Sequence, residues 1–180
     1  MRRPKAKLRA LVSRPPFNRL SGFSITLAAC LLLSSCRPTM TQAVKADATS
    51  GLCPVCRMKV NASDPWASEI HYSGGTKLMF ESPGDMMAFY SEPGKYKVAD
   101  ALKDRSNIEK IVVKDYQTKE EIDARKAKLV YKSKIDGPMG PDFLPFSKRE
   151  DAESFVALNG GTVVALNEVT LEMVQNLRKR

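Results

Sequence analysis

The sequence predicts an α+β fold in which two small strand-strand-helix lobes form one compact mature domain. Short strand-like runs come in pairs, and each pair is followed by a segment with the residues that start a helix. The second half of the chain repeats this order loosely. Strands grouped ahead of helices, rather than alternating regularly with them, are typical of α+β domains. No short-period repeat or low-complexity segment interrupts the order.

The first predicted lobe is a hairpin followed by a helix. Glu69–Tyr72 and Lys77–Phe80 are strand-like, and Ser73–Thr76, with its two glycines, is a hairpin turn signal. The helix starts after Ser82, which can cap it, and ends before Pro93. A proline and an acid suit its first turn, and its apolar residues favour the core over metal contact. The proline is Pro83, the acid is Asp85, and the apolar residues are Met86, Met87, Phe89 and Tyr90.

The second predicted lobe begins with two strands. Ile108–Tyr116 and Lys128–Tyr131 are the strand candidates, and the charged segment Gln117–Lys126 between them is expected to be a loop or a short helix. A helix follows through Leu158, because the tetrapeptide Ser147–Glu150 has the pattern of a capping box. The order closes with a Gly-Gly stop, a strand and a helix, at Gly160-Gly161, Thr162–Leu166 and Val169–Leu177.

The N-terminus has the pattern of an export signal. A basic leader without acidic residues precedes an apolar run from about Phe23 to Leu33, too short for a permanent membrane span. The run ends in Leu-Ser-Ser-Cys36, which resembles a bacterial lipobox, so residues 1–35 are predicted to be removed and Cys36 to be lipidated. Residues 36–51 would form a flexible tether, and 52–180 the folded domain. A signal peptide cut elsewhere, or an uncleaved anchor, is the alternative.

Removing the leader changes the charge balance. The chain has 29 basic and 20 acidic residues, and seven of the basic ones lie in the leader, which leaves 22 against 20, or +2. The mature part has no block of like charge and only scattered aromatic residues, so nucleic-acid binding is not expected. Cys53 and Cys56 remain as free thiols, too few for a disulfide framework.

The cluster Cys53-Pro-Val-Cys56-Arg-Met58 is the strongest candidate for chemistry. Thiolate and thioether are soft ligands that select Cu(I), and the weaker thioether would help a site to release its metal. Other interpretations remain open: a structural or redox-active disulfide, one part of a zinc site, or a methionine that only packs in the core.

Two further residues are candidate ligands. His71 is the only histidine, and its strand position, on the same face as Glu69, allows it to point toward a site. Met139 lies in Gly137–Phe146, whose two glycines and three prolines exclude a regular helix or a central strand. Such a loop can either display the thioether at the surface or plug the core with its apolar side chains.

Together these segments resemble the nitrous oxide reductase accessory lipoprotein family, usually called NosL. The resemblance covers about Leu52 to Val169. The matching features are the lipobox, the short tether, Cys56-Arg-Met58, the stretch Met139–Phe146, and Asp151–Phe155 with Asn159–Val164. One departure is Arg57, because many relatives have glycine between the cysteine and the methionine; its charge could lower the thiol pKa or discourage a cation.

The resemblance implies a copper chaperone rather than an enzyme. Its Cu(I) ligands would be Cys56, Met58 and Met139, with Cys53 as a further ligand or a redox partner of Cys56. The copper acceptor would be apo nitrous oxide reductase, reached through a membrane assembly complex. The lipid anchor would hold the protein on a membrane facing the periplasm, and Arg37 after the lipidated cysteine slightly favours the outer membrane. The alternative is a periplasmic thiol-disulfide protein that uses Cys53 and Cys56.

Overall fold

The structure is a computed structural model of the 180-residue chain, and it describes residues 51–177 and 179. The chain divides into two units, Met1–Thr39 and Met40–Arg180, and all described residues belong to the second. The predicted leader, the predicted lipidation site Cys36 and the predicted tether up to residue 50 lie outside the described residues. Within the described residues, no helix has the length and apolar character that a membrane span requires.

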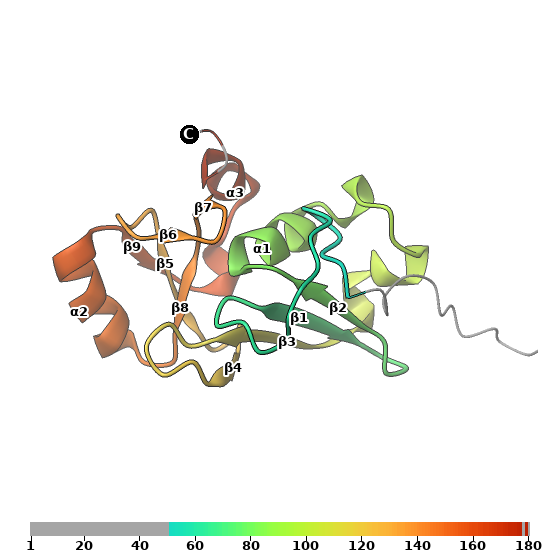
Figure 1. The fold of residues 1–180 in the computed structure, drawn as a ribbon, viewed down its shortest axis with the longest axis horizontal. Helices are drawn as coiled ribbons and strands as arrows, with labels where there is room; N and C mark the ends of the chain where they lie inside the picture. Colours follow the sequence, from blue (N-terminus) through green and yellow to red (C-terminus); the bar gives the residue numbers. More distant parts are fainter. Residues whose placement is uncertain (1–50, 178, 180) are drawn as a thin grey trace, which may run out of the picture. The chain divides into compact units, whose positions relative to one another are not determined.

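The first sheet is antiparallel, with strand order β2-β1-β3-β4 (Figure 1). The predicted hairpin is confirmed: Ile70 lies opposite Leu78 on one side and Ile111 on the other. Two details differ from the sequence prediction. β3 joins this sheet rather than the second lobe, and β4 lies in the segment expected to be a loop or a helix, because its backbone extends along β3 at the edge. The strands are β1 Ser68–Tyr72, β2 Lys77–Phe80, β3 Ile108–Lys114 and β4 Glu121–Asp123.

Helix α1, Pro83–Ser91, covers one face of the first sheet and is itself covered by α3, Leu171–Leu177 (Figure 1). It starts as predicted, because the side chain of Ser82 accepts a hydrogen bond from the backbone N–H of Asp85 at 3.3 Å. The rings of Phe80 and Phe89 lie 5.4 Å apart and identify the covered face. The first sheet contacts one side of α1 and α3 contacts another, so the first seven residues of α1 are buried.

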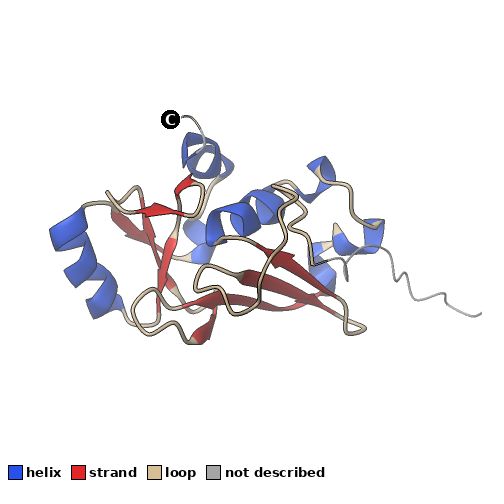
Figure 2. Cartoon of the chain, viewed as in Figure 1, coloured by secondary structure: helices blue, strands red, loops and turns tan. Residues whose placement is uncertain are grey.

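The second sheet has strand order β8-β5-β9 and is covered by helix α2 (Figure 2). Successive residues of β5 point to opposite faces, so Leu129 joins the core around α1 while Val130 joins a second core with Phe155 of α2. The proline of β8 lies on an edge strand, where it is tolerated. The elements are β5 Lys128–Tyr131, β8 Leu144–Phe146, β9 Thr162–Val164 and α2 Arg149–Asn159. The α+β class is therefore confirmed.

The capping box predicted at the start of α2 is wrong. The cap residue is Lys148, without a side-chain hydrogen bond. Ser147 instead bonds to the loop after β3: its backbone N–H donates a hydrogen bond to Oδ2 of Asp115 at 2.6 Å. The predicted stop is confirmed: Gly160 ends α2 in the left-handed region, with φ +69°.

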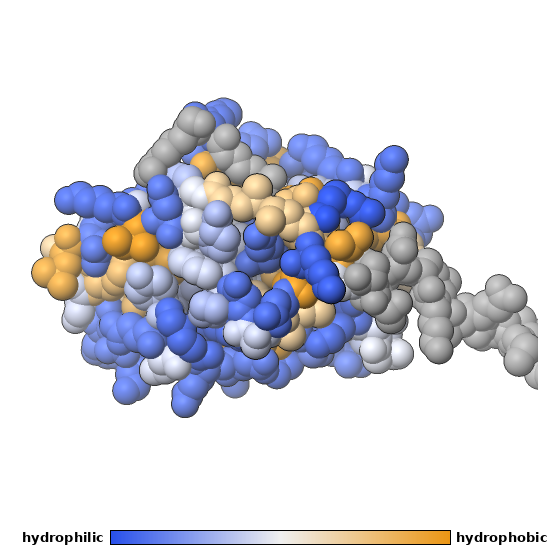
Figure 3. All heavy atoms as spheres, in the orientation of Figure 1, coloured by the Kyte–Doolittle hydropathy of each residue, from blue (hydrophilic) through white to orange (hydrophobic). Residues whose placement is uncertain are grey.

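A short hairpin carries Met139. Strands β6, Asp136–Gly137, and β7, Gly140–Pro141, pair through Gly137 and Gly140 and leave Met139 in the two-residue turn between them. The face seen in Figure 3 is largely hydrophilic with small separate apolar patches. Among the described residues, Met139 is one of four large hydrophobic side chains that are exposed, with Met58, Leu158 and Leu171. Single-turn 3-10 helices in the connections are Pro93–Lys95, Asp100–Leu102, Arg105–Asn107 and Leu166–Glu168.

Candidate metal centre

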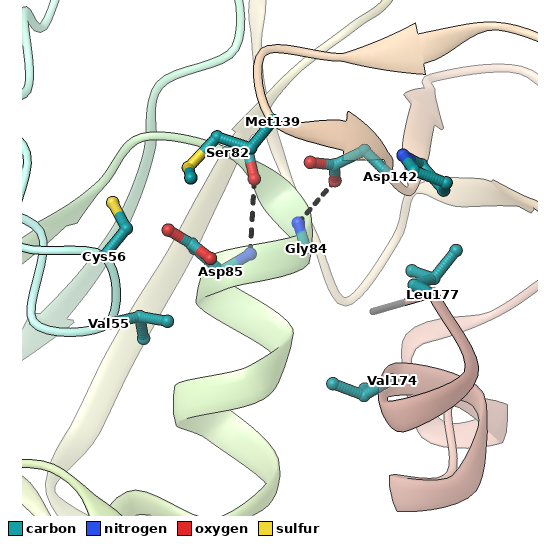
Figure 4. Close-up of a pocket in the computed structure, with 10 residues that line it drawn as sticks. Val55, Cys56, Ser82, Gly84, Asp85, Met139, Asp142, Val174 and Leu177 are labelled. Carbon is teal, nitrogen blue, oxygen red and sulfur yellow. Dashed lines mark hydrogen bonds between the residues drawn. The ribbon is translucent and has the colours of Figure 1, made fainter. Parts of the chain in front are cut away.

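The two cysteines lie in a tight loop ahead of β1. A bridge between Leu52 and Lys59 closes the loop. Inside it, the N–H of Cys53 donates to the carbonyl of Met58 at 2.8 Å, and the N–H of Arg57 donates to the carbonyl of Cys53 at 2.9 Å. The loop is thus held by its own backbone hydrogen bonds, and it places Cys56 near Asp85 at the N-terminus of α1 (Figure 4).

The loop brings both thiols to a carboxylate of α1. One ligand atom each from Cys53, Cys56 and Asp85 lie within 4.8 Å of one another. The Cys53 thiol is fully buried and donates to Oδ2 of Asp85 at 3.2 Å. Asp85 is 8% exposed and sits in the first turn of α1, where the helix dipole favours a negative charge. These three groups are the candidate metal-binding cluster of the described residues.

The environment keeps both thiols protonated in the metal-free protein. Burial raises the pKa of Cys53 and of Cys56 above the usual thiol value. Carboxylates act in the same direction: Asp85 raises the pKa of both thiols, and Glu81, which accepts a hydrogen bond from the Cys56 thiol at 3.2 Å, raises that of Cys56. The lowering of the thiol pKa that Arg57 could cause is therefore outweighed, since the pKa of both thiols moves upward. A metal ion that binds a thiolate here must therefore displace the thiol proton.

Met139 faces the cysteine loop across an open cavity of about 420 Å³. The cavity lies between the loop, the N-terminus of α1, the β6–β7 hairpin and α3. In Figure 4 the Met139 side chain extends from the hairpin toward the side that holds Cys56 and Asp85. The structure thus brings a thiol and a thioether from distant parts of the sequence to one cavity. Its lining residues are Val55, Cys56, Ser82, Gly84, Asp85, Met139, Pro141, Asp142, Val174 and Leu177.

The remaining two predicted ligands lie elsewhere. Met58 is on the cysteine loop, 47% exposed, and is not part of the cavity wall. His71 lies on β1, where it makes a 2.6 Å contact with Oε2 of Glu69. Alternation along β1 puts Ile70 on the face covered by α1 and His71 on the opposite face, so the structure does not bring His71 to the cysteine cluster.

Sequence reasoning missed two carboxylates of the site. An acidic residue in the first turn of a helix is already favoured by the helix dipole, so the sequence gives no sign that Asp85 also contacts Cys53. Glu81 precedes the helix cap without any motif. A signal that could have found both is the crowding of acids and a helix start directly after a strand. A single sequence does not show that Asp85 contacts Cys53, which lies 32 residues earlier in the chain.

Comparison with known proteins completes the description of the site. The chain is similar to the copper chaperone NosL from Shewanella denitrificans, with 24% identity, a TM-score of 0.55, and coverage of 67% of this chain and 90% of that one. It is also similar to the solution structure of apo-NosL from Achromobacter cycloclastes, with 32% identity, a TM-score of 0.42, and coverage of 59% and 87%. No curated protein matches the chain. The NosL family model matches residues 44–174, which is more than half of the chain, so the chain belongs to the NosL family.

Proposed function

We propose that this protein binds one Cu(I) ion as cargo and hands it to a copper enzyme during maturation of that enzyme. The observation that carries the proposal is the meeting of the Cys56 thiol and the Met139 thioether at one open cavity. Soft sulfur ligands favour Cu(I) over harder cations, and a set that mixes thiolate with thioether holds the ion less firmly than thiolates alone. Cys56 and Met139 are the ligands best supported by the geometry.

Met58 is proposed as a third ligand. It lies two residues after Cys56, on the loop whose backbone fixes the cysteine pair, and its side chain is free at the surface in the metal-free structure. A methionine has three rotatable side-chain bonds, so a turn of the side chain toward Cys56 needs no movement of the backbone. Cys53 is proposed as a further ligand or a redox partner of Cys56, since its thiol lies in the same cluster.

Exposure of the thioethers supports a carrier over a permanent metal site. Met139 is 62% exposed and Met58 47%, so an acceptor protein could reach the copper from the side of the methionines while Cys53 stays buried. Exchange of ligands one at a time between donor and acceptor requires this kind of access. The relative from Shewanella denitrificans is itself named a copper chaperone, which is consistent with this assignment.

The proposal extends to the place of the protein and to its partners. Residues 1–35 would direct export and Cys36 would carry the lipid, so that the domain faces the periplasm from a membrane, the outer one being slightly favoured by Arg37. The client would be nitrous oxide reductase, reached through its membrane assembly complex. This part rests on membership of the NosL family and on the lipobox-like sequence.

The test is an anaerobic titration of the reduced full chain, in detergent, with Cu(I) against a competing chelator. The variants Met58→Leu and Met139→Leu remove sulfur while nearly keeping side-chain volume. Met79→Leu is the matched control, because Met79 lies on β2, on the face away from α1. We expect each ligand variant, and Cys56→Ala, to raise the dissociation constant more than about tenfold, or 1.4 kcal/mol, while the control stays unchanged.

The same experiment separates the proposal from the thiol-disulfide alternative. A redox protein would bind copper weakly, or with no dependence on Met139, and would show a reversible Cys53–Cys56 couple that neither methionine affects. Two observations weigh against that alternative. The cysteines are on a loop and not in the first turn of a helix, and burial raises both thiol pKa values.

A further inference from the structure

The side chain of Asp142 is enclosed between two glycines that belong to different parts of the site. A Cβ atom built on Gly84 of α1 would lie 2.8 Å from Oδ1 of Asp142, and one built on Gly137 of β6 would lie 2.8 Å from its Cβ. Neither glycine has the positive φ that would itself require glycine. Both are therefore explained by the close approach of Asp142 and not by backbone conformation.

Hydrogen bonds fix Asp142 in this position. Its Oδ1 accepts from the N–H of Gly84 at 2.5 Å and from the N–H of Phe143 at 2.7 Å. The first bond satisfies one of the unpaired N–H groups at the start of α1, in the turn that also carries Asp85. The second holds the chain just after the β6–β7 hairpin. Asp142 thus ties the helix end of the site to the segment that displays Met139.

We propose that Asp142, clamped between Gly84 and Gly137, is a positioning residue that holds the Met139 turn at the distance from Cys56 that copper binding requires. The inference rests on the proposed copper function. Asp142 is 5% exposed and is not itself a ligand in this proposal. A hairpin with strands of two residues each is marginal by itself, so contacts with the rest of the fold, such as this clamp, must hold it in place.

The first experiment measures the clamp without copper. Amide hydrogen exchange of the metal-free full chain is compared between wild type, Gly137→Ala and Gly94→Ala. Gly94 is the matched control, because a Cβ there has no neighbour within 4 Å and its φ is not positive. Gly137→Ala should speed exchange in residues 136–143 and at Gly84 and leave the rest of α1 protected. Exchange unchanged from that of Gly94→Ala, in a folded protein, would overturn the proposal.

The second experiment asks whether the clamp acts through Met139. Disturbing a group that orients a metal ligand typically weakens binding about 10- to 100-fold, so we expect Gly137→Ala and Asp142→Ala to raise the Cu(I) dissociation constant by this factor. Asp142→Asn, which keeps the Oδ1 acceptor and the shape, should restore most of the affinity. In a Met139→Leu background, Gly137→Ala should have no further effect. A loss of the same size in both backgrounds would overturn the proposal.

The outcomes also separate this proposal from the proposed function. If wild type fails to bind copper, the carrier function is wrong, whereas the exchange experiment still decides whether Asp142 holds the hairpin. If wild type binds copper and Met139→Leu binds equally well, the hairpin is not part of the site and the positioning role falls with it. If Met139→Leu binds poorly but Gly137→Ala and Asp142→Ala bind as wild type does, only the positioning role is refuted.

Discussion

The backbone of Arg57 turns the cysteine loop back on itself. Its φ of +66° lies in the left-handed region, and its N–H closes the turn onto the carbonyl of Cys53 at 2.9 Å. Side chains with a Cβ adopt this conformation at a cost of about 1–2 kcal/mol, which glycine avoids. A glycine at this position would form the same turn without that cost, and Arg57 forms it at some cost in stability.

Arg57→Gly should therefore stabilise the metal-free protein. We expect a gain in the free energy of unfolding of about 1 kcal/mol, reduced by the greater freedom of glycine in the unfolded chain. Thermal unfolding measures it, with Lys126→Gly as the control, since Lys126 is exposed and has no positive φ. A lower unfolding temperature for Arg57→Gly, equal to that of the control, would show that the left-handed conformation carries no strain.

The raised thiol pKa values make copper binding depend on pH. Burial first, and carboxylates second, hold the pKa of Cys53 and Cys56 above the usual thiol value, so the metal-free thiols stay protonated near neutral pH. For each thiol proton that Cu(I) displaces, the apparent affinity for copper should rise about tenfold for every unit of increase in pH, until the pH reaches the thiol pKa. Titration at several pH values, corrected for the chelator, measures the slope. An affinity independent of pH would mean that the thiols are already ionised.

At the scale of elements, the turn from α2 to β9 contains two adjacent glycines that are required for different structural reasons. Gly160 has φ +69° and open space around it. Gly161 has φ +99°, and a Cβ there would lie 2.7 Å from the carbonyl oxygen of Tyr131 on β5. The second glycine therefore lets the α2–β9 connection approach β5 closely enough for β9 to pair with it.

The two glycines form a matched pair for a test of this packing. Gly160→Ala should cost about 1–2 kcal/mol of the free energy of unfolding, from the left-handed backbone alone. Gly161→Ala should cost clearly more, because the backbone of β5 must also move. Denaturant unfolding of the two variants gives the comparison. Equal losses would contradict a close contact between this turn and β5.

The predictable elements are those with a strong local signal. The β1–β2 hairpin has alternating residues around a Gly-Gly turn, and α1 has its cap at Ser82, so the sequence predicts both. β4 and the β6–β7 hairpin have two or three residues per strand, too few to show alternation, and they exist because a neighbouring strand pairs with them. The wrong capping box has a similar cause, since Asp115, 32 residues away, takes the N–H of Ser147.

The residues of the site also differ in whether the sequence alone reveals them. The thiols of Cys53 and Cys56 and the thioether of Met139 are recognisable from residue chemistry, and the structure brings Cys56 and Met139 to one cavity. Asp85 and Asp142 join the site through contacts with residues far along the chain, Cys53 and Gly84, and a single sequence does not reveal those contacts.

At the scale of the whole described domain, the cavity that Cys56 and Met139 line lies where the two lobes meet. Its walls come from the cysteine loop and α1 on one side and from the β6–β7 hairpin, next to the second sheet, on the other. Leu129 and Phe143 of the second lobe pack in the core around α1. The site is thus assembled by the tertiary fold, and its geometry depends on how firmly the lobes are joined, as at Asp142.

The buried carboxyl of Asp142 predicts a pH-dependent stability. Burial, followed by a smaller effect of the Asp85 charge, raises its pKa to about 7, against the backbone hydrogen bonds that lower it. Because the folded-state pKa lies above the unfolded one, this residue's contribution is present at acid pH and is lost as pH rises from about 4 to about 7. Asp142→Asn should remove this component, which unfolding of both proteins across that range measures. Parallel stability profiles would refute it.

We propose that Cu(I) binds between the cysteine loop and the β6–β7 hairpin that carries Met139, and X-ray absorption at the copper edge is the sharpest test of this site. The sample is the reduced full chain loaded with Cu(I) without oxygen, beside its Met139→Leu and Met79→Leu variants. We predict coordination by sulfur alone, with one sulfur lost in Met139→Leu and none in Met79→Leu. Coordination by nitrogen, as from His71, or a sulfur count that Met139→Leu leaves unchanged, would exclude copper binding at this site.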